Sequence, residues 1–143
     1  MTAQKLLLDT CAITWLANDA YMESAALEAI TSAGESDDVF VSAASAWEIG
    51  LLSRPRPNRP PIYQFLPDPK TWFARIVSAP GIRPSPITTA IALDAAHLPG
   101  DLHNDPADRL LIATARQLGA ALVTRDRKIL DYAGAGFVDA IAC

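Results

Sequence analysis

Residues 103–126 constrain the fold more than any other stretch, because they combine a loop, a capped helix, a glycine stop and a buried strand. Asp105 is expected to cap the helix, with Pro106 at its first position. Gly119 is expected to end it. Residues 120–123 are short and apolar, which is typical of a buried parallel strand. The stretch therefore predicts one helix–strand unit of an α/β sheet.

Asp108 is the unusual residue of this helix, because helical spacing places its carboxylate on the inward face. The apolar residues that share this face are Leu111, Ile112 and Ala115. Arg109 and Arg116 are expected on the opposite, solvated side. Thr124 and Asp126 follow the strand at its carboxyl end, where open α/β sheets bind ligands.

Two other places repeat the order of strand and acid. Residues 5–8 form a short apolar run that is followed at once by Asp9 and Thr10, either of which can cap the next helix. Residues 39–41 predict a second buried strand, with Ser42 as the cap of a helix over residues 43–52. Glu48 is the only charge in that helix, so it needs a partner from elsewhere, either an arginine or a metal ion.

The remaining elements are predicted from periodicity and turn residues. We expect a helix over 23–30 with a polar break at 34–38, and an amphipathic helix around 72–77. Residues 81–87 are too proline-rich for a central strand and fit an edge strand. A capped helix is expected from Thr88 or Thr89 to His97, and another over 126–132. Phe137 and Val138 fit a last strand, and Trp15 is expected in the core.

Residues 53–69 have a different composition, with six prolines and three arginines, Arg54, Arg56 and Arg59. The pattern favours a solvated loop. Because the arginines alternate with Tyr63 and Phe65, contact with a nucleic acid stays open.

Length and charge limit the possible classes of protein. A chain of 143 residues fits one domain, residues 1–143, and its net charge of −4 argues against coating a nucleic acid by charge alone. Cys11 and Cys143 lack the spacing of a zinc site. No apolar run is long enough for a membrane span or signal peptide, so we expect a cytoplasmic protein without membrane contact.

Four acids from separate places, Asp9, Glu48, Asp108 and Asp126, are expected near one edge of the sheet. Carboxylates that converge need a cation, and oxygen ligands favour Mg²⁺ or Mn²⁺. Such an ion can polarise a phosphoryl oxygen, which suggests phosphodiester hydrolysis. A phosphatase, or a nuclease that acts on DNA, stays possible at this point. A phosphoaspartate enzyme is not supported, because Cys11 stands where a second aspartate is needed, and no Walker lysine or glycine-rich nucleotide loop is present.

The chain resembles the PIN domain, and within it the VapC-like toxins of bacterial toxin–antitoxin pairs. The motifs that carry the resemblance are Leu-Leu-Leu-Asp-Thr, Val-Ser-Ala-Ala-Ser-Ala-Trp-Glu-Ile-Gly, His-Asn-Asp-Pro-Ala-Asp-Arg-Leu-Leu-Ile-Ala-Thr-Ala and Leu-Val-Thr-Arg-Asp. It implies a three-layer α/β/α fold with a central parallel sheet, dependence on Mg²⁺ or Mn²⁺, and endonucleolytic cleavage of RNA.

The family's four catalytic and metal-binding acids match Asp9, Glu48, Asp108 and Asp126. Asp105 matches an additional metal-adjacent acid, and Thr10 and Thr124 match small hydroxyl positions that can orient a carboxylate. Where relatives usually have His and Phe, this chain has Cys11 and Ala107. Arg109 or Arg125 is expected to help neutralise phosphate.

The resemblance also implies partners: an RNA substrate, a VapB-like antitoxin, a second copy of the chain in a homodimer, and operator DNA bound only through the antitoxin. The rival reading from another class is a catalytically silent PIN-like protein that binds RNA or acts as a scaffold.

Overall fold

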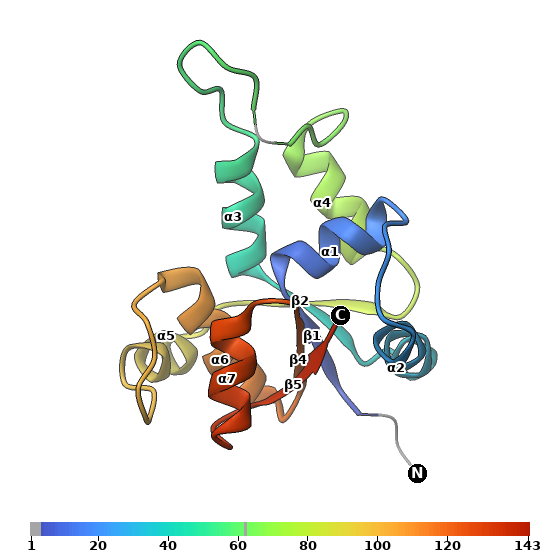
Figure 1. Cartoon of the computed structure of the whole chain (residues 1–143). Coiled ribbons are helices and arrows are strands. Elements are labelled where there is room, and N and C mark those ends of the chain that lie inside the picture. Colours follow the sequence, from blue (N-terminus) through green and yellow to red (C-terminus); the bar gives the residue numbers. More distant parts are fainter. Residues whose placement is uncertain (1–3, 62) are drawn as a thin grey trace.

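The computed structural model describes residues 4–61 and 63–143, and within them five parallel strands form one twisted sheet (Figure 1). The predicted domain, residues 1–143, thus includes a few positions outside this description. The order across the sheet is β3-β2-β1-β4-β5. The strands are β1 (Leu6–Leu8), β2 (Val39–Ser42), β3 (Ile82–Ser85), β4 (Ala121–Thr124) and β5 (Asp139–Ala142).

The centre of the sheet is β1, whose three leucines are fully buried. Leu7 pairs with Phe40 of β2 on one side and with Leu122 of β4 on the other. Such two-sided burial explains why these strands are continuous apolar runs. The proline-rich β3 lies at the edge, as predicted, where Pro84 costs the sheet no central hydrogen bond.

Helices cover both faces of the sheet in this part of the chain, which confirms the three-layer arrangement (Figure 1). Leu6 and Leu8 pack with α1 and α2 on one face, while Leu7 packs with α6 and α7 on the other. None of the helices described has the length and apolar character to cross a membrane. The helices are α1 (Thr10–Ala17), α2 (Ser24–Glu35), α3 (Ala43–Leu52), α4 (Pro69–Val77), α5 (Thr89–Ala96), α6 (Pro106–Leu118) and α7 (Arg127–Gly134).

The predicted polar break at 34–38 begins two residues later than expected, because α2 continues through Gly34 to Glu35 and residues 36–38 form the turn before β2. Gly81 approaches this turn so closely that a Cβ atom there would lie 2.6 Å from the Gly34 carbonyl oxygen. Gly81 also has a φ of +84°, which favours glycine. The two glycines therefore serve a close backbone contact between α2 and the start of β3.

The last strand and Trp15 also differ from expectation. The strand covers Asp139–Ala142 instead of Phe137 and Val138. Gly136 has a φ of +93°, and the Phe137 ring packs against Tyr132 of α7 with 5.0 Å between ring centroids, so these residues still belong to the turn. Trp15 is only half-buried.

Candidate functional site

The carboxyl ends of the central strands bring the predicted acids to one pocket of about 410 Å³. Asp9 directly follows β1, Asp126 lies two residues beyond β4, and Glu48 lies in the helix that follows β2. Asp105 and Asp108 reach the same pocket from the start of α6. The pocket, which we call the acidic pocket, is lined by Asp9, Thr10, Cys11, Trp15, Glu48, Asp105, Asp108, Leu111, Arg125 and Asp126.

Asp9 is the most buried of these acids, with 7% of its surface exposed. It caps α1 by accepting a 2.7 Å hydrogen bond from the Ala12 N–H, and it accepts another from the Thr124 hydroxyl. Burial raises the pKa of Asp9, and the nearby charges of Asp108 and Asp126 add to the rise. A cation beside Asp9 would therefore relieve an electrostatic cost.

The partner of Glu48 is a hydroxyl group, as the family resemblance suggested for Thr10. The Thr10 hydroxyl, from α1, donates a hydrogen bond to the Glu48 carboxylate, and Ser45 Oγ lies 3.1 Å from the same hydroxyl. Burial raises the pKa of Glu48, and Asp108 and Asp105 add repulsion. The expected arginine partner is absent from the hydrogen bonds and ion pairs of the described residues, while the alternative, a metal ion, stays a prediction.

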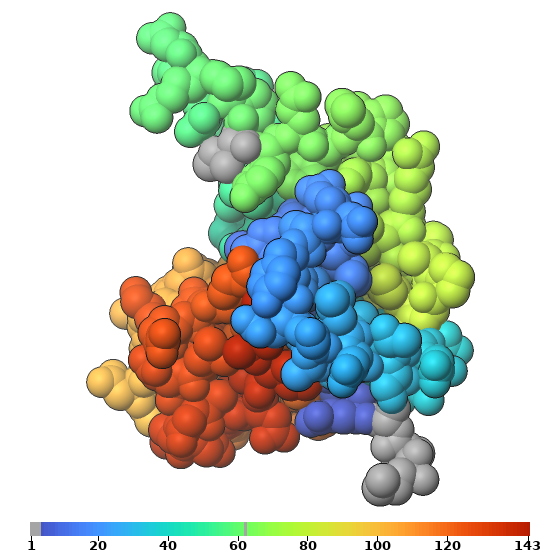
Figure 2. Space-filling model, turned by 45° about the vertical axis from the view of Figure 1, so that its right-hand side comes forward, coloured from blue at the N-terminus to red at the C-terminus, as the bar shows by residue number. Residues whose placement is uncertain are grey.

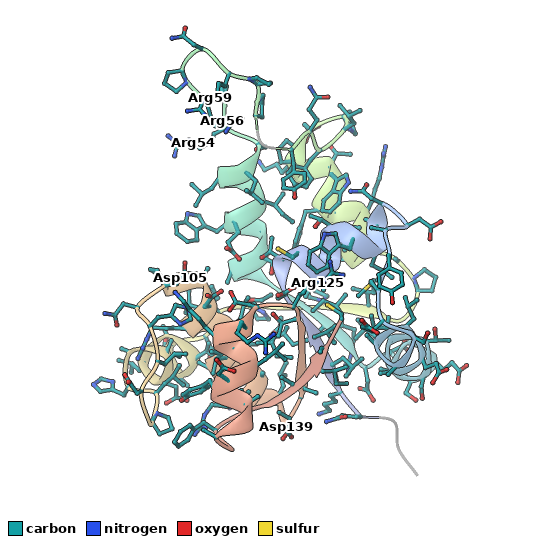
Figure 3. The ribbon with its side chains drawn as sticks, in the orientation of Figure 1. Arg54, Arg56, Arg59, Asp105, Arg125 and Asp139 are labelled. Atoms are coloured by element: carbon teal, nitrogen blue, oxygen red, sulfur yellow. The ribbon has the colours of Figure 1, made fainter. Side chains whose placement is uncertain are left out.

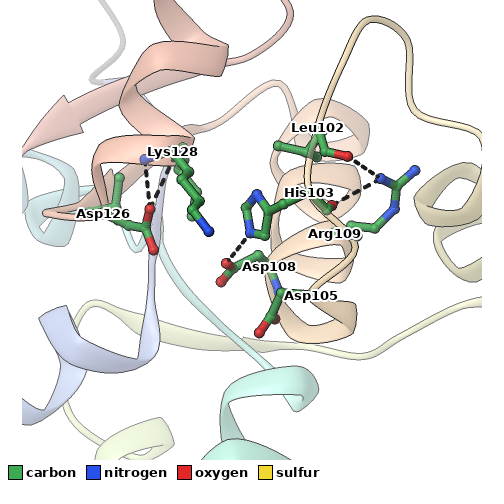
Figure 4. Close-up of polar contacts among 9 residues, drawn as sticks. Leu102, His103, Asp105, Asp108, Arg109, Asp126 and Lys128 are labelled. Atoms are coloured by element: carbon green, nitrogen blue, oxygen red, sulfur yellow. Dashed lines mark hydrogen bonds and ion pairs between the residues drawn. The ribbon is translucent and has the colours of Figure 1, made fainter.

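His103 holds the carboxylate of Asp108, with 2.7 Å between Nε2 and Oδ2 (Figure 4). Burial raises the pKa of Asp108, while the hydrogen bond from His103 opposes the rise. The sequence analysis did not assign His103 to the site. Its position five residues before Asp108, in the loop that enters α6, was the available clue.

Asp105 and Asp126 both act as helix caps. Asp105 accepts a 2.9 Å hydrogen bond from the Asp108 N–H, and Asp126 accepts from the N–H groups of Lys128, at 2.8 Å, and Ile129, at 3.3 Å. The Lys128 side chain extends toward the space between Asp126 and His103 (Figure 4). Helix capping alone would thus explain why an aspartate occurs at position 105 and at position 126.

Arg109 is half-buried instead of solvated, and it is not among the described residues that line the acidic pocket, while a role at phosphate stays a prediction. Its guanidinium donates to the carbonyl oxygens of Ala95 (2.9 Å), Leu102 (3.3 Å) and His103 (3.2 Å). These bonds connect α5 and the loop before α6 to one fixed side chain. Arg109 therefore positions the loop that carries His103.

Arg125 lies at the rim of the acidic pocket, where Figure 3 labels it. Its guanidinium stacks over the Trp15 ring at 3.7 Å from the centroid and donates to the carbonyl oxygens of Cys143 and Tyr21. These contacts explain why Trp15, which also packs against the core, is only half-buried. They also fix one positive charge beside the acids.

The acids have the right chemistry for a hard cation, but their side chains are bonded elsewhere. In their present positions, no three His, Cys, Asp or Glu side chains within 4–61 and 63–143 form a set that could hold a metal ion. Glu48, Asp108 and Asp126 are turned toward Thr10, His103 and the start of α7. Each of these bonds uses one carboxylate oxygen, so the second oxygen of each side chain is the donor left for an ion.

Cys11 lines the same pocket but is a poor nucleophile. Burial, together with the charges of Asp9 and Glu48, raises the pKa of the Cys11 thiol to about 11. The thiol is consequently protonated near neutral pH. The pocket is thus better suited to activating water than to covalent catalysis.

Comparison with known proteins agrees with this arrangement. Residues 6–135 match the model of the PIN domain. Ribonuclease VapC22 of Mycobacterium tuberculosis is 34% identical over 128 residues, which cover 89% of this chain and 91% of the relative. The fold is similar to that in the crystal structure of VapBC2 from Rickettsia felis bound to a promoter DNA fragment, with a TM-score of 0.64, 11% identity and coverage of 96% of this chain and 97% of that chain. It is also similar to FitAcB from Neisseria gonorrhoeae, with a TM-score of 0.58, 18% identity and coverage of 95% and 96%.

Proposed function

Because this chain belongs to the PIN-domain family, we propose that it is a VapC-like toxin that hydrolyses RNA phosphodiester bonds as a metal-dependent endoribonuclease. The observation that carries the proposal is the acidic pocket, where five carboxylates from four elements line one space. Ribonuclease VapC22, which is 34% identical over most of both chains, supports the same reaction.

Asp9, Glu48, Asp108 and Asp126 would hold Mg²⁺ or Mn²⁺, with Asp105 beside them. The fit rests on the donor set, which is all oxygen, and on burial and mutual repulsion, which together raise the pKa of the three most buried acids. When bound, a hard cation polarises a phosphoryl oxygen and lowers the pKa of water.

The neighbouring residues give these acids fixed positions. Thr10 orients Glu48, and Thr124 connects two acids, because its hydroxyl donates to Asp9 and accepts a 3.0 Å bond from the Asp126 N–H. His103 orients Asp108. Such support keeps the oxygen donors near the geometry in which they act.

Arg125 is the cation placed to meet the substrate. Its guanidinium is held on the pocket rim by Trp15 and two carbonyl groups, so its charge needs no ordering when a phosphate arrives. A preorganised cation of this kind stabilises the charge that develops on a phosphoryl group.

The partner that we propose is a VapB-like antitoxin, which would neutralise the toxin and attach the pair to operator DNA. The similar structures of VapBC2 and FitAcB support such a pairing, and the VapBC2 crystal structure contains a promoter DNA fragment. We also propose a homodimer. The net charge of −4 fits a protein that leaves DNA binding to its partner.

One observation favours the alternative of a catalytically silent PIN-like protein. Among the described residues, no three His, Cys, Asp or Glu side chains are arranged to hold an ion. Such a protein would bind RNA or a partner without turnover.

The test is cleavage of a tRNA pool by the purified chain in Mg²⁺, with EDTA and an identically purified Asp108→Asn variant as controls. We expect cutting in Mg²⁺ and loss of cutting in both controls. Cleavage that persists in EDTA or in the variant would refute the metal-site mechanism. Absence of any cutting would favour the silent alternative, and a parallel single-stranded DNA substrate separates a ribonuclease from a DNA nuclease.

A further inference from the structure

The proposed function leaves the segment after α3 unexplained. Residues 53–61, which we call the basic arm, project beyond the ends of α3 and α4 (Figure 1). The arm carries Arg54, Arg56 and Arg59, three of the 12 basic residues of the chain, and none of its 16 acidic residues. It is therefore a local positive charge on an otherwise acidic protein.

The arm is an ordered turn. Arg56 and Arg59 form an antiparallel bridge, Asn58 between them has a φ of +57°, and the Arg56 Nε donates to the Pro60 carbonyl oxygen at 2.9 Å. In the part of the chain that the structure covers, none of the three arginines is in an ion pair with a carboxylate. Their charges are thus available to a ligand.

A stripe along α3 connects the arm to the acidic pocket. Trp47, Leu51 and Arg54 follow at intervals of four and three residues, so they share one side of the helix and its extension. Trp47 is 53% exposed, although tryptophan side chains are usually mostly buried. It is adjacent in sequence to Glu48 of the acidic pocket. The distance along the helix axis from Glu48 to Leu52, the last residue of α3, is only about 6 Å.

The figures show the same arrangement. The three arginines lie at the outer end of α3, and Asp105 lies near its inner end on the same side (Figure 3). The space-filling view shows the outline hollowed between the projecting arm and the segment before α6 (Figure 2). A strand that follows this hollow from the side of Asp105 would run along α3, the helix that carries Trp47, and reach the arm.

We propose that the basic arm and Trp47 bind single-stranded RNA on one side of the scissile phosphate, with the arginines on the backbone and the indole under a base. The inference rests on the proposed function, because it names the substrate track of the same pocket. Cationic side chains next to an exposed aromatic ring are the combination that holds single strands. The absence of acidic residues from the arm's sequence favours a polyanion over a protein surface of mixed charge.

The sequence favoured a solvated loop and left open a contact of its arginines, Tyr63 and Phe65 with nucleic acid, and the structure removes Phe65 from that alternative. Phe65 is only 5% exposed and packs edge-on against Trp72, with 4.8 Å between centroids. It therefore anchors the base of the loop on α4. Trp47, which the sequence analysis did not single out, is the aromatic residue of the track.

The test measures binding of a labelled single-stranded RNA of random sequence to an Asp9→Asn background, in which cleavage is blocked. Arg54→Gln/Arg59→Gln removes two charges and keeps the Arg56–Pro60 bond. The matched control is Lys5→Gln/Arg75→Gln, which removes two exposed charges at the amino edge of the sheet and in the last turn of α4. Circular dichroism checks that every variant is folded.

We expect the arm variant to bind at least about tenfold more weakly, since each lost contact is a charge-assisted hydrogen bond. The slope of log K against log salt should fall by about 1.4, or about 0.7 for each lost phosphate contact on a single strand. Trp47→Ala should weaken binding by about fivefold or more. In an active background, most of the arm variant's loss should fall on KM rather than kcat.

Equal affinity and equal salt slope in the arm variant and the matched control would overturn the proposal. Normal RNA binding with loss of antitoxin capture would also overturn it, because the arm would then be a protein interface. If the wild type binds RNA through the arm but cuts none in Mg²⁺, the arm is supported and the proposed enzymatic function fails.

Discussion

Asp126 has two separable roles, as the cap of α7 and as a proposed metal ligand, and two substitutions distinguish them. Its carboxylate accepts hydrogen bonds from the Lys128 N–H at 2.8 Å and the Ile129 N–H at 3.3 Å. Asn caps a helix about as well as Asp, whereas Ala cannot cap it. Asp126→Asn should therefore keep the fold and lose the metal ligand, and Asp126→Ala should lose both.

The magnitudes follow from these contacts. Loss of a cap costs about 1 kcal/mol, within a range of roughly 0.5–2 kcal/mol, so Asp126→Ala should lower the melting temperature by about 2–4 °C. Asp126→Asn should stay within about 1 °C of the wild type, since the cap is kept. Both variants should cut RNA roughly 100-fold more slowly or worse, because a cation at a phosphoryl oxygen contributes several kcal/mol.

Asp68 supplies the matched control. It caps α4 by accepting from the Thr71 N–H and hydroxyl, both at 2.8 Å, and it is not among the described residues that line the acidic pocket. Asp68→Ala should lower the melting temperature through the lost cap and leave cleavage unchanged. Asp126→Asn with wild-type cleavage would refute the reasoning, since Asp126 would then be a cap alone.

Three further predictions concern the same pocket. Mg²⁺ at about 100 times its Kd should stabilise the wild type by about 2.7 kcal/mol in thermal melts and Asp9→Asn much less; an equal shift would exclude Asp9 as a ligand. In the folded protein, burial raises the pKa of Asp9 and Glu48 above their ordinary values. The protonated carboxyl groups therefore stabilise the fold fully at pH values below the ordinary pKa, and this stability is lost as pH rises through the raised pKa. In EDTA, Asp9→Asn should therefore melt higher than the wild type at pH 7, and the gap should narrow as pH falls towards about 4; a constant gap would contradict the pKa direction. Arg109→Lys should reduce cleavage while far-UV circular dichroism stays unchanged, because one ammonium cannot reach three carbonyl groups as the guanidinium does. Unchanged cleavage would show that the loop before α6 does not need the hydrogen bonds of Arg109.

The elements that the sequence predicted well depend on local chemistry. Residues 43–52 form the predicted helix with Ser42 as its cap, and Asp105 and Gly119 begin and end α6 as expected. Caps and glycine stops involve side chains and backbone groups only two to four residues apart. The resemblance to the family also predicted a central parallel sheet, and the parallel pairing of β1 with β2 and with β4 confirms this prediction.

Contacts between distant segments were beyond the sequence. The resemblance suggested that Thr10 orients a carboxylate, but Thr10 and Glu48 are 38 residues apart, and no local pattern predicts which acid is its partner. Arg109 was assigned to solvent from helical periodicity, but the path of the preceding loop places three free carbonyl oxygens within its reach. Periodicity describes the face of a helix and not the loop that passes over it.

The capping roles of the acids agree with the proposed metal site, because both arise from the same topology. In a parallel sheet the helices that follow the strands begin at the carboxyl edge, so the helices after Asp9, Asp105 and Asp126 direct their N–H groups toward the pocket. These partial positive charges offset part of the repulsion among carboxylates when no cation is bound. A fold that gathers helix starts at one edge can therefore keep several aspartates there at low cost. It follows that a hydrogen-bonded cap at each acid is no evidence against a catalytic role, and only substitutions that keep the cap and remove the charge can separate the two.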